Sequence, residues 1–205
     1  MLNEEKPRLS AAKAGFAGKN FIKDIKLHFA TLIMFGLLFP LLIWAIGLVF
    51  PNQSSGLPIY KNSQLIGFEN IGQKFTSDKY FWGRPSAVDY NAASTGGSNK
   101  GPANPEYLKE VEKRIEYFLK RNPGIKRNQI PSDLVTASGS GIAPDISVQG
   151  AIIQIPRVAK ARAISQVELK KLVEEHIGKP LLGFFGPEHV NVLKLNIALD
   201  KLKNN

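Results

Sequence analysis

The segment Phe29–Phe50, FATLIMFGLLFPLLIWAIGLVF, decides the architecture of this chain, because none of its 22 residues is charged. At a rise of about 1.5 Å per residue, a helix of this length covers about 33 Å, enough for the roughly 30 Å hydrocarbon core of a bilayer. No second stretch of the chain approaches this length. The sequence therefore predicts a protein that crosses a membrane once, through residues 29–50.

Two other interpretations of the run fit less well. A secretory signal peptide has an apolar region of roughly 7–15 residues before a small-residue cleavage site. Here the run is longer, and the polar residues 51–56, PNQSSG, contain no Ala-x-Ala site. A buried helix of a soluble domain usually keeps a polar face, which this run lacks. We therefore expect a retained anchor, followed by residues 51–56 as a linker.

The charged flanks of the run predict its orientation. Residues 1–28 contain six basic and three acidic side chains, whereas the first cation after the run is Lys61. Lys and Arg are in excess on the cytoplasmic flank of spanning helices. We therefore expect residues 1–28 to form a cytoplasmic tail and residues 57–205 to form one extracytoplasmic domain.

Composition narrows the functions of that domain. Cysteine is absent, which excludes disulfides, thiolate chemistry and cysteine–zinc sites. Six of the 27 basic and three of the 17 acidic residues precede the run, which leaves a net charge of +7 after it. Outside the membrane, such a charge favours anionic headgroups or an acidic partner surface over nucleic acid. The cations are spread along the chain, as on an ordinary solvated surface.

Local patterns predict a mixed α+β domain. Apolar runs on either side of Asn62-Ser63 indicate a β-hairpin, and residues 91–104 form a long loop that is either functional or disordered. Helical periodicity follows in four places, and a short strand is expected at Val190 and Val192. The expected helices run from the N-cap Asn104 to Pro123, from Ser147 to Ala163 with a break at Pro156, from the capping box Ser165–Glu168 to Gly178, and through Leu195, Leu199 and Leu202.

No catalytic centre is evident in the sequence. The three histidines, His28, His176 and His189, lack the spacing of a helical zinc site, so we expect no metal. There is no Gly-x-Ser-x-Gly nucleophile elbow, and no pair of carboxylates stands out for acid–base chemistry. The chain is expected not to be an enzyme on its own.

Three sets of residues are candidates for binding. The segment Ser138-Gly139-Ser140-Gly141, before an expected helix, either presents N–H groups to a phosphate or forms a flexible turn. Trp82 and Arg84 either contact a partner or form an aromatic core corner in which Arg84 fixes a loop. In the span, small residues allow close helix packing; these are Gly36, Ala45 and Gly47.

Five strings in order then carry a resemblance: KYFWGRPSA (79–87), GGSNKGPANP (96–105), VTASGSG (135–141), QIPRVAKAR (154–162) and VNVLKLNIALD (190–200). Together with one N-terminal span, they resemble the C subunit of the Kdp potassium-transporting ATPase. The resemblance implies a bacterial or archaeal plasma-membrane complex that uses ATP to import potassium. It implies as partners a potassium-pore subunit, an ATP-hydrolysing P-type subunit and a small single-span subunit.

The resemblance also implies a role as a catalytic chaperone that raises the ATP affinity of the catalytic subunit, with nucleotide near Ser138–Gly141. That location conflicts with the expected topology, because ATP is cytoplasmic and residues 135–147 are expected outside. We therefore favour an accessory role in assembly, in which the domain covers the potassium entrance. The alternative is a stand-alone anchored domain that binds an anionic ligand or polymer.

Overall fold

The computed structural model describes residues 12–50, 54–61 and 63–202. The chain divides into two compact units, Met1–Ser55 and Gly56–Asn205. The first eleven residues of the expected tail and residues 51–53 of the expected linker lie outside the described part.

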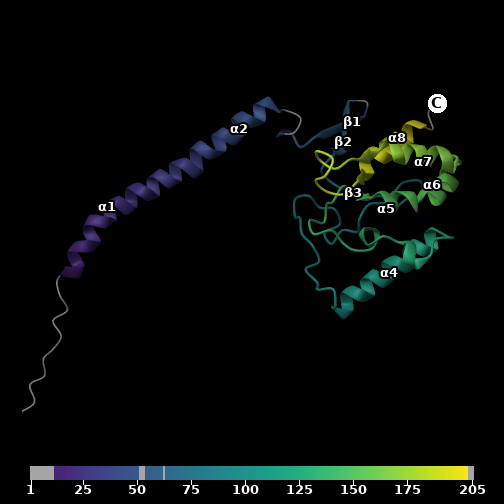
Figure 1. The fold of residues 1–205 in the computed structure, drawn as a ribbon, viewed down its shortest axis with the longest axis horizontal. Helices are drawn as coiled ribbons and strands as arrows, with labels where there is room; N and C mark the ends of the chain where they lie inside the picture. The colour runs from purple at the N-terminus through teal and green to yellow at the C-terminus, as the bar shows by residue number, and fades with distance from the viewer. Residues whose placement is uncertain (1–11, 51–53, 62, 203–205) are drawn as a thin grey trace, which may run out of the picture. The chain divides into compact units, whose positions relative to one another are not determined.

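The first unit is one long helix (Figure 1), made of α1 (Ala12–Ile33), the π-helical turn η1 (Met34–Leu38) and α2 (Phe39–Val49). The part of this helix from Phe21 to Val49 is long enough to cross a membrane, and its most apolar window has a mean hydropathy of 2.6. No part of that window is buried within the structure. The expected single span is therefore confirmed as a helix, and this helix begins well before Phe29.

Pro40 explains the π turn within the span. Proline has no N–H for the carbonyl of Gly36, four residues earlier, and its ring would clash with that carbonyl. The helix widens just before it, so that the N–H of Phe39 donates to the oxygen of Met34, five residues back.

The second unit contains two small antiparallel sheets. β1 (Pro58–Lys61) and β2 (Gln64–Phe68) form the predicted hairpin. The other sheet has the order β3-β5-β4, with β3 (Asp145–Ser147), β4 (Ile177–Gly178) and β5 (His189–Asn191). β5 confirms the strand expected at Val190, but Val192 already begins a helix. β3 and β4 were not predicted, because strands of two or three residues are too short to show alternation.

The helices begin where their caps predict. α4 (Pro105–Arg121) is capped by Asn104, whose side chain accepts from the N–H groups of Glu106 and Tyr107. Ser147 caps α5 (Val148–Ile152), and Ser165 caps α7 (Gln166–Glu175). Pro156 lies in the first turn of α6 (Ile155–Arg162), which separates α6 from α5 as expected. α8 (Val192–Leu202) is the predicted terminal helix.

One hydrophobic core joins these elements. Figure 1 shows α6, α7 and α8 side by side, and α4 stands apart from them in the same unit. Side chains from all of these helices meet around the segment that contains Phe81; the fully buried ones include Phe81, Val158, Leu169, Val173, Leu195 and Leu199. The fold is thus the expected α+β domain. Residues 69–104, however, form neither helix nor strand, so their backbone needs other hydrogen-bond partners.

Candidate functional site

At the centre of the domain, buried amide side chains supply hydrogen-bond partners for the irregular backbone around Phe81. The N–H of Phe81 donates to Oδ1 of Asn196 at 2.9 Å, and Nδ2 of Asn196 donates back to the carbonyl of Phe81 at 2.9 Å. Gln154 binds Trp82 in the same two-way manner, at 2.8 and 3.1 Å. Each amide therefore takes the place of a neighbouring strand for one residue.

Two arginines extend this network. Arg157 donates to the carbonyls of Asp78 and Tyr80 at 2.8 and 3.0 Å. Its guanidinium lies 3.9 Å from the ring centroid of Trp82, a cation–π contact. Burial lowers the pKa of Arg157 to about 10, so the side chain stays charged at neutral pH. Arg162 donates to the carbonyl of Lys79 at 2.7 Å.

Three of the strings that carry the resemblance thus pack on one another: residues 79–87, 154–162 and 190–200. The indole of Trp82 is only 9% exposed and stacks on Tyr117, with ring centroids 5.6 Å apart. The edge of Phe118 completes its surroundings. The structure therefore places Trp82 in the aromatic core, and its contact with a partner stays a prediction.

Arg84 lies at the margin of this core. Its side chain is half-buried, and its Nε has no hydrogen-bond partner among the described residues. Its carbonyl accepts from the hydroxyl of Tyr90. Burial, and then the charge of Asp89, raise the pKa of Tyr90 to about 12, which keeps that hydroxyl a donor. The backbone of Arg84 is therefore held by Tyr90, and a role of its side chain in fixing the loop stays a prediction.

The Ser138–Gly141 segment packs directly against this loop. The N–H of Ser138 donates to the carbonyl of Pro85 at 3.1 Å, and the N–H of Gly96 donates to the carbonyl of Ser140 at 2.9 Å. Gly141 has a φ of +73°, and a Cβ there would lie 2.4 Å from Val88. The glycine is thus required by close packing between two loops.

The same packing uses part of the segment's hydrogen-bonding groups within the domain. Ser138 is buried, and its N–H and that of Gly141 are used within the domain. Only Gly139 and Ser140 keep N–H groups without a bond to another described residue. The next element along the chain is the strand β3, which pairs with β5, and the helix expected from Ser147 follows it as α5.

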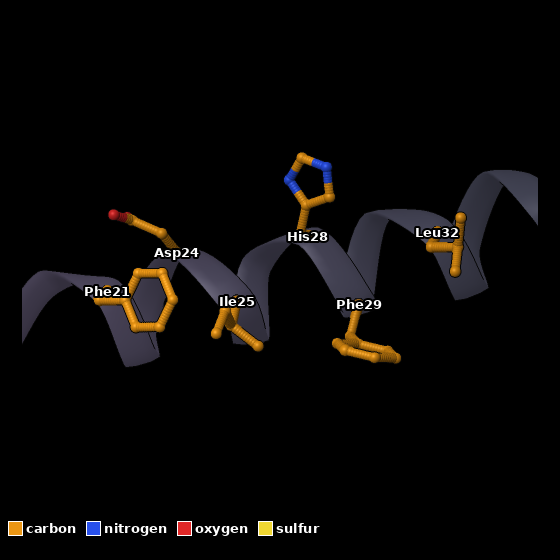
Figure 2. Close-up of a pocket in the computed structure, with 6 residues that line it drawn as sticks. All are labelled: Phe21, Asp24, Ile25, His28, Phe29 and Leu32. Carbon is orange, nitrogen blue, oxygen red and sulfur yellow. The ribbon is translucent and has the colours of Figure 1, made fainter.

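Two hollows lie elsewhere on the described surface. A cleft of about 690 Å³ is lined by Asp78, Lys120, Arg121, Arg157 and Lys160, among others. It keeps a positive charge, because Asp78 pairs with Arg121 alone, at 2.8 Å, while Arg157 is held by backbone carbonyls. The other is a groove on α1, where Asp24 and His28 project to one side of the helix and Ile25 and Phe29 to the other (Figure 2). All of its lining residues come from α1, so it is an open groove along a single helix.

The small residues of the span do not form one stripe. Gly36 lies in the π turn, and a Cβ added there would meet no atom within 4 Å. Ala45 and Gly47 are two residues apart in α2, so they lie on opposite sides of it. Among the residues that the structure describes, no group of three or more His, Cys, Asp or Glu side chains is placed to hold a metal ion.

Comparisons with known proteins agree on one family. The family model described as KdpC, K+-transporting ATPase, c chain, matches residues 21–201. The potassium-transporting ATPase KdpC subunit of Flavobacterium johnsoniae is 51% identical over 185 residues, covering 90% of this chain and 100% of that protein. The KdpC subunit of Bacteroides fragilis is 47% identical over 189 residues, covering 91% and 99%. That of Caldanaerobacter subterraneus subsp. tengcongensis is 46% identical over 183 residues, covering 89% and 95%.

Proposed function

The chain belongs to the KdpC family, the c chains of K+-transporting ATPases, and on this premise we propose that its domain holds the complex together from the extracytoplasmic side. It is a membrane-anchored accessory subunit of a potassium-import complex and is not catalytic on its own. Family membership thus decides against a stand-alone domain that binds an anionic polymer.

The proposed orientation rests on the charges that flank the span. Six basic side chains precede Phe29, and no cation lies between Lys26 and Lys61. The helix that continues upstream from Phe29 carries Lys23 and Lys26 on its exposed surface. Such a flank favours the cytoplasm, which leaves the folded domain on the other side.

The proposed partners are the potassium-pore subunit, the ATP-hydrolysing P-type subunit and a small single-span subunit. The spanning helix packs between them, and this is supported by its most apolar window, of which nothing is buried within this chain. The domain covers the entrance through which potassium reaches the pore.

In this proposal the chain affects the ATP affinity of the catalytic subunit through contact with that subunit, and not by binding nucleotide itself. One observation carries this proposal: the N–H of Ser138 is used on the carbonyl of Pro85 and that of Gly141 on the carbonyl of Ser138, so two of the four N–H groups of the segment are taken up within the domain. A chaperone role in this form raises the ATP affinity of the catalytic subunit by stabilising one arrangement of the complex.

Labelling of an introduced cysteine tests the proposal, because the chain has none of its own. Ser138 is too buried to react, so Ser140→Cys, which is exposed, is the informative variant. Val167→Cys, on the exposed face of α7, is its matched control. In intact cells, we expect a membrane-impermeant maleimide to label both. Labelling only after the membrane is opened would overturn the orientation and reopen a direct ATP site.

A further inference from the structure

The loop between β4 and β5 exposes the most concentrated apolar surface of the domain. Residues 180–187, PLLGFFGP, are eight in a row without a polar side chain. Leu181, Leu182, Phe184 and Phe185 are 71%, 74%, 70% and 56% exposed. Other strongly exposed apolar side chains of the domain, such as Tyr60, Leu108 and Val167, come from separate elements. Grouped exposure of this kind marks an interaction site, whereas single exposed residues need no explanation.

The loop has a defined shape. The N–H of Leu181 donates to the carbonyl of Phe185 at 3.0 Å, and the N–H of Phe185 donates back at 2.9 Å. The two phenylalanine rings lie 4.2 Å apart, centroid to centroid. Leu182 has a φ of +55°, a left-handed conformation that is unfavourable for a residue other than glycine. The chain thus holds a strained hairpin, residues 181–185, with its apolar side chains outward.

These features favour a protein surface over lipid as the occupant. Lipid makes no demand on the shape of a loop, whereas a strained, ordered tip suits a matching depression. Loops at the headgroup layer are typically rich in Trp, Tyr, Lys and Arg. This hairpin has none of them between its flanking prolines, and outside these Lys179 is balanced by Glu188.

The exposed area of the hairpin and the short chain between the span and β1 restrict the choice of partner further. Two leucines and two phenylalanines exposed to this degree present on the order of 500 Å², a large part of the roughly 800 Å² that each partner gives to a standard interface. Between Val49, the end of the span, and Pro58, the start of β1, the chain reaches at most about 30 Å. The domain therefore stays near the membrane surface, where the other subunits of the transporter stand.

We propose that the 181–185 hairpin inserts into an apolar depression on the extracytoplasmic face of another subunit of the potassium-transporting complex. This rests on the proposed function, since it requires the domain to be extracytoplasmic. Leu182 and Phe184 are the side chains that enter the depression, because both are strongly exposed and lie between the paired residues Leu181 and Phe185, at the tip.

Photo-crosslinking identifies the occupant. Phe184 is replaced by benzoylphenylalanine in the full chain, expressed with the other subunits of the complex. We expect irradiation to join it to one of those subunits, while the same replacement at Val167, 81% exposed on α7, yields no such adduct. Adducts with lipid alone, with a second copy of this chain, or with nothing would each overturn the proposal.

Substitution at the tip tests whether the contact supports assembly. The double variant Leu182→Ser and Phe184→Ser keeps the backbone pairing and removes two apolar anchors. We expect at least tenfold less of the other subunits to be recovered with the tagged chain, and no change for Val167→Ser. The thermal midpoint of the purified chain should be unchanged, because all three side chains are exposed.

The outcome separates this inference from the proposed function. Undiminished recovery of the other subunits with the double variant would contradict the role of the hairpin and leave the proposed function unaffected. The proposed function would be contradicted as well if the unmodified chain recovered no other subunit, or if Ser140→Cys were labelled only from the cytoplasm.

Discussion

Asn196 and Gln154 do for the segment Phe81-Trp82 what a neighbouring strand does in a sheet. Both side chains are buried, and each satisfies one backbone N–H and one backbone carbonyl. Buried backbone groups without partners are costly, which explains why amide side chains occupy buried positions at the N-cap of α6 and within α8.

The network predicts a large cost for an apolar replacement. Asn196→Leu keeps the approximate volume but leaves the N–H and carbonyl of Phe81 unpaired, so we expect a loss of about 2–5 kcal/mol in the free energy of unfolding. Denaturant unfolding of the full chain measures it. Asn70→Leu, at an exposed turn, is the control and should change stability by less than about 0.5 kcal/mol.

Substitution of Trp82 distinguishes a role in the core from a contact with a partner. Because its indole is buried against Tyr117 and Arg157, Trp82→Ala should lower the free energy of unfolding by about 3–5 kcal/mol. Val167→Ala should have almost no effect. If the variant kept its stability and lost only its ability to join the complex, the indole would be a contact after all.

Asp200 introduces a dependence on pH. Burial acts to raise the pKa of Asp200, but the hydrogen bond and charge of Arg162, together with Lys61, bring it below the usual 3.8. A carboxyl whose pKa is lowered by folding stabilises the fold above the unfolded pKa, and that contribution disappears as the pH falls through the folded value.

Asp200→Asn should therefore destabilise the chain by about 1–3 kcal/mol at pH 7, since it leaves the largely buried Arg162 without its carboxylate. At pH 3 the difference from the unmodified chain should be smaller. Unfolding curves at both pH values measure this. An equal difference at both would show that packing, and not charge, is responsible.

The spanning helix shows how one residue shapes an element. Pro40 produces the π turn Met34–Leu38, and Gly36, whose carbonyl loses its usual partner, lies inside that turn. A Cβ at Gly36 meets nothing within this chain, so any constraint on its size comes from a neighbouring helix.

Gly36→Leu therefore tests the packing of the span. We expect less of the partner subunits to be recovered with the tagged chain, because close approach of two helices requires a small residue. Ala45→Leu and Gly47→Leu, on opposite sides of α2, then indicate which side faces a partner. Unchanged recovery with Gly36→Leu would remove this face from consideration.

At the scale of the whole molecule, family membership and structure answer different questions. The family shows that the chain is an accessory subunit of a potassium-transporting ATPase. The structure shows which residues of the strings that carry the resemblance serve the fold. Many residues in the ranges 79–87, 154–162 and 190–200 are buried and pack on one another in the core. The surface features left over are the exposed hairpin 181–185 and the spanning helix, and these are where we place the contacts with partners.

The sequence by itself determined the span, the hairpin at residues 58–68 and the starts of α4, α5 and α7. These depend on local causes: the length of an apolar run, a turn, a capping side chain or a proline. Only the tertiary structure decided that Trp82 is core, that a strand follows the Ser138–Gly141 segment, and that Asn196 pairs with a backbone 115 residues away. Such contacts leave no periodic signal, because they arise when distant parts of the chain meet and each buried polar group must find a partner.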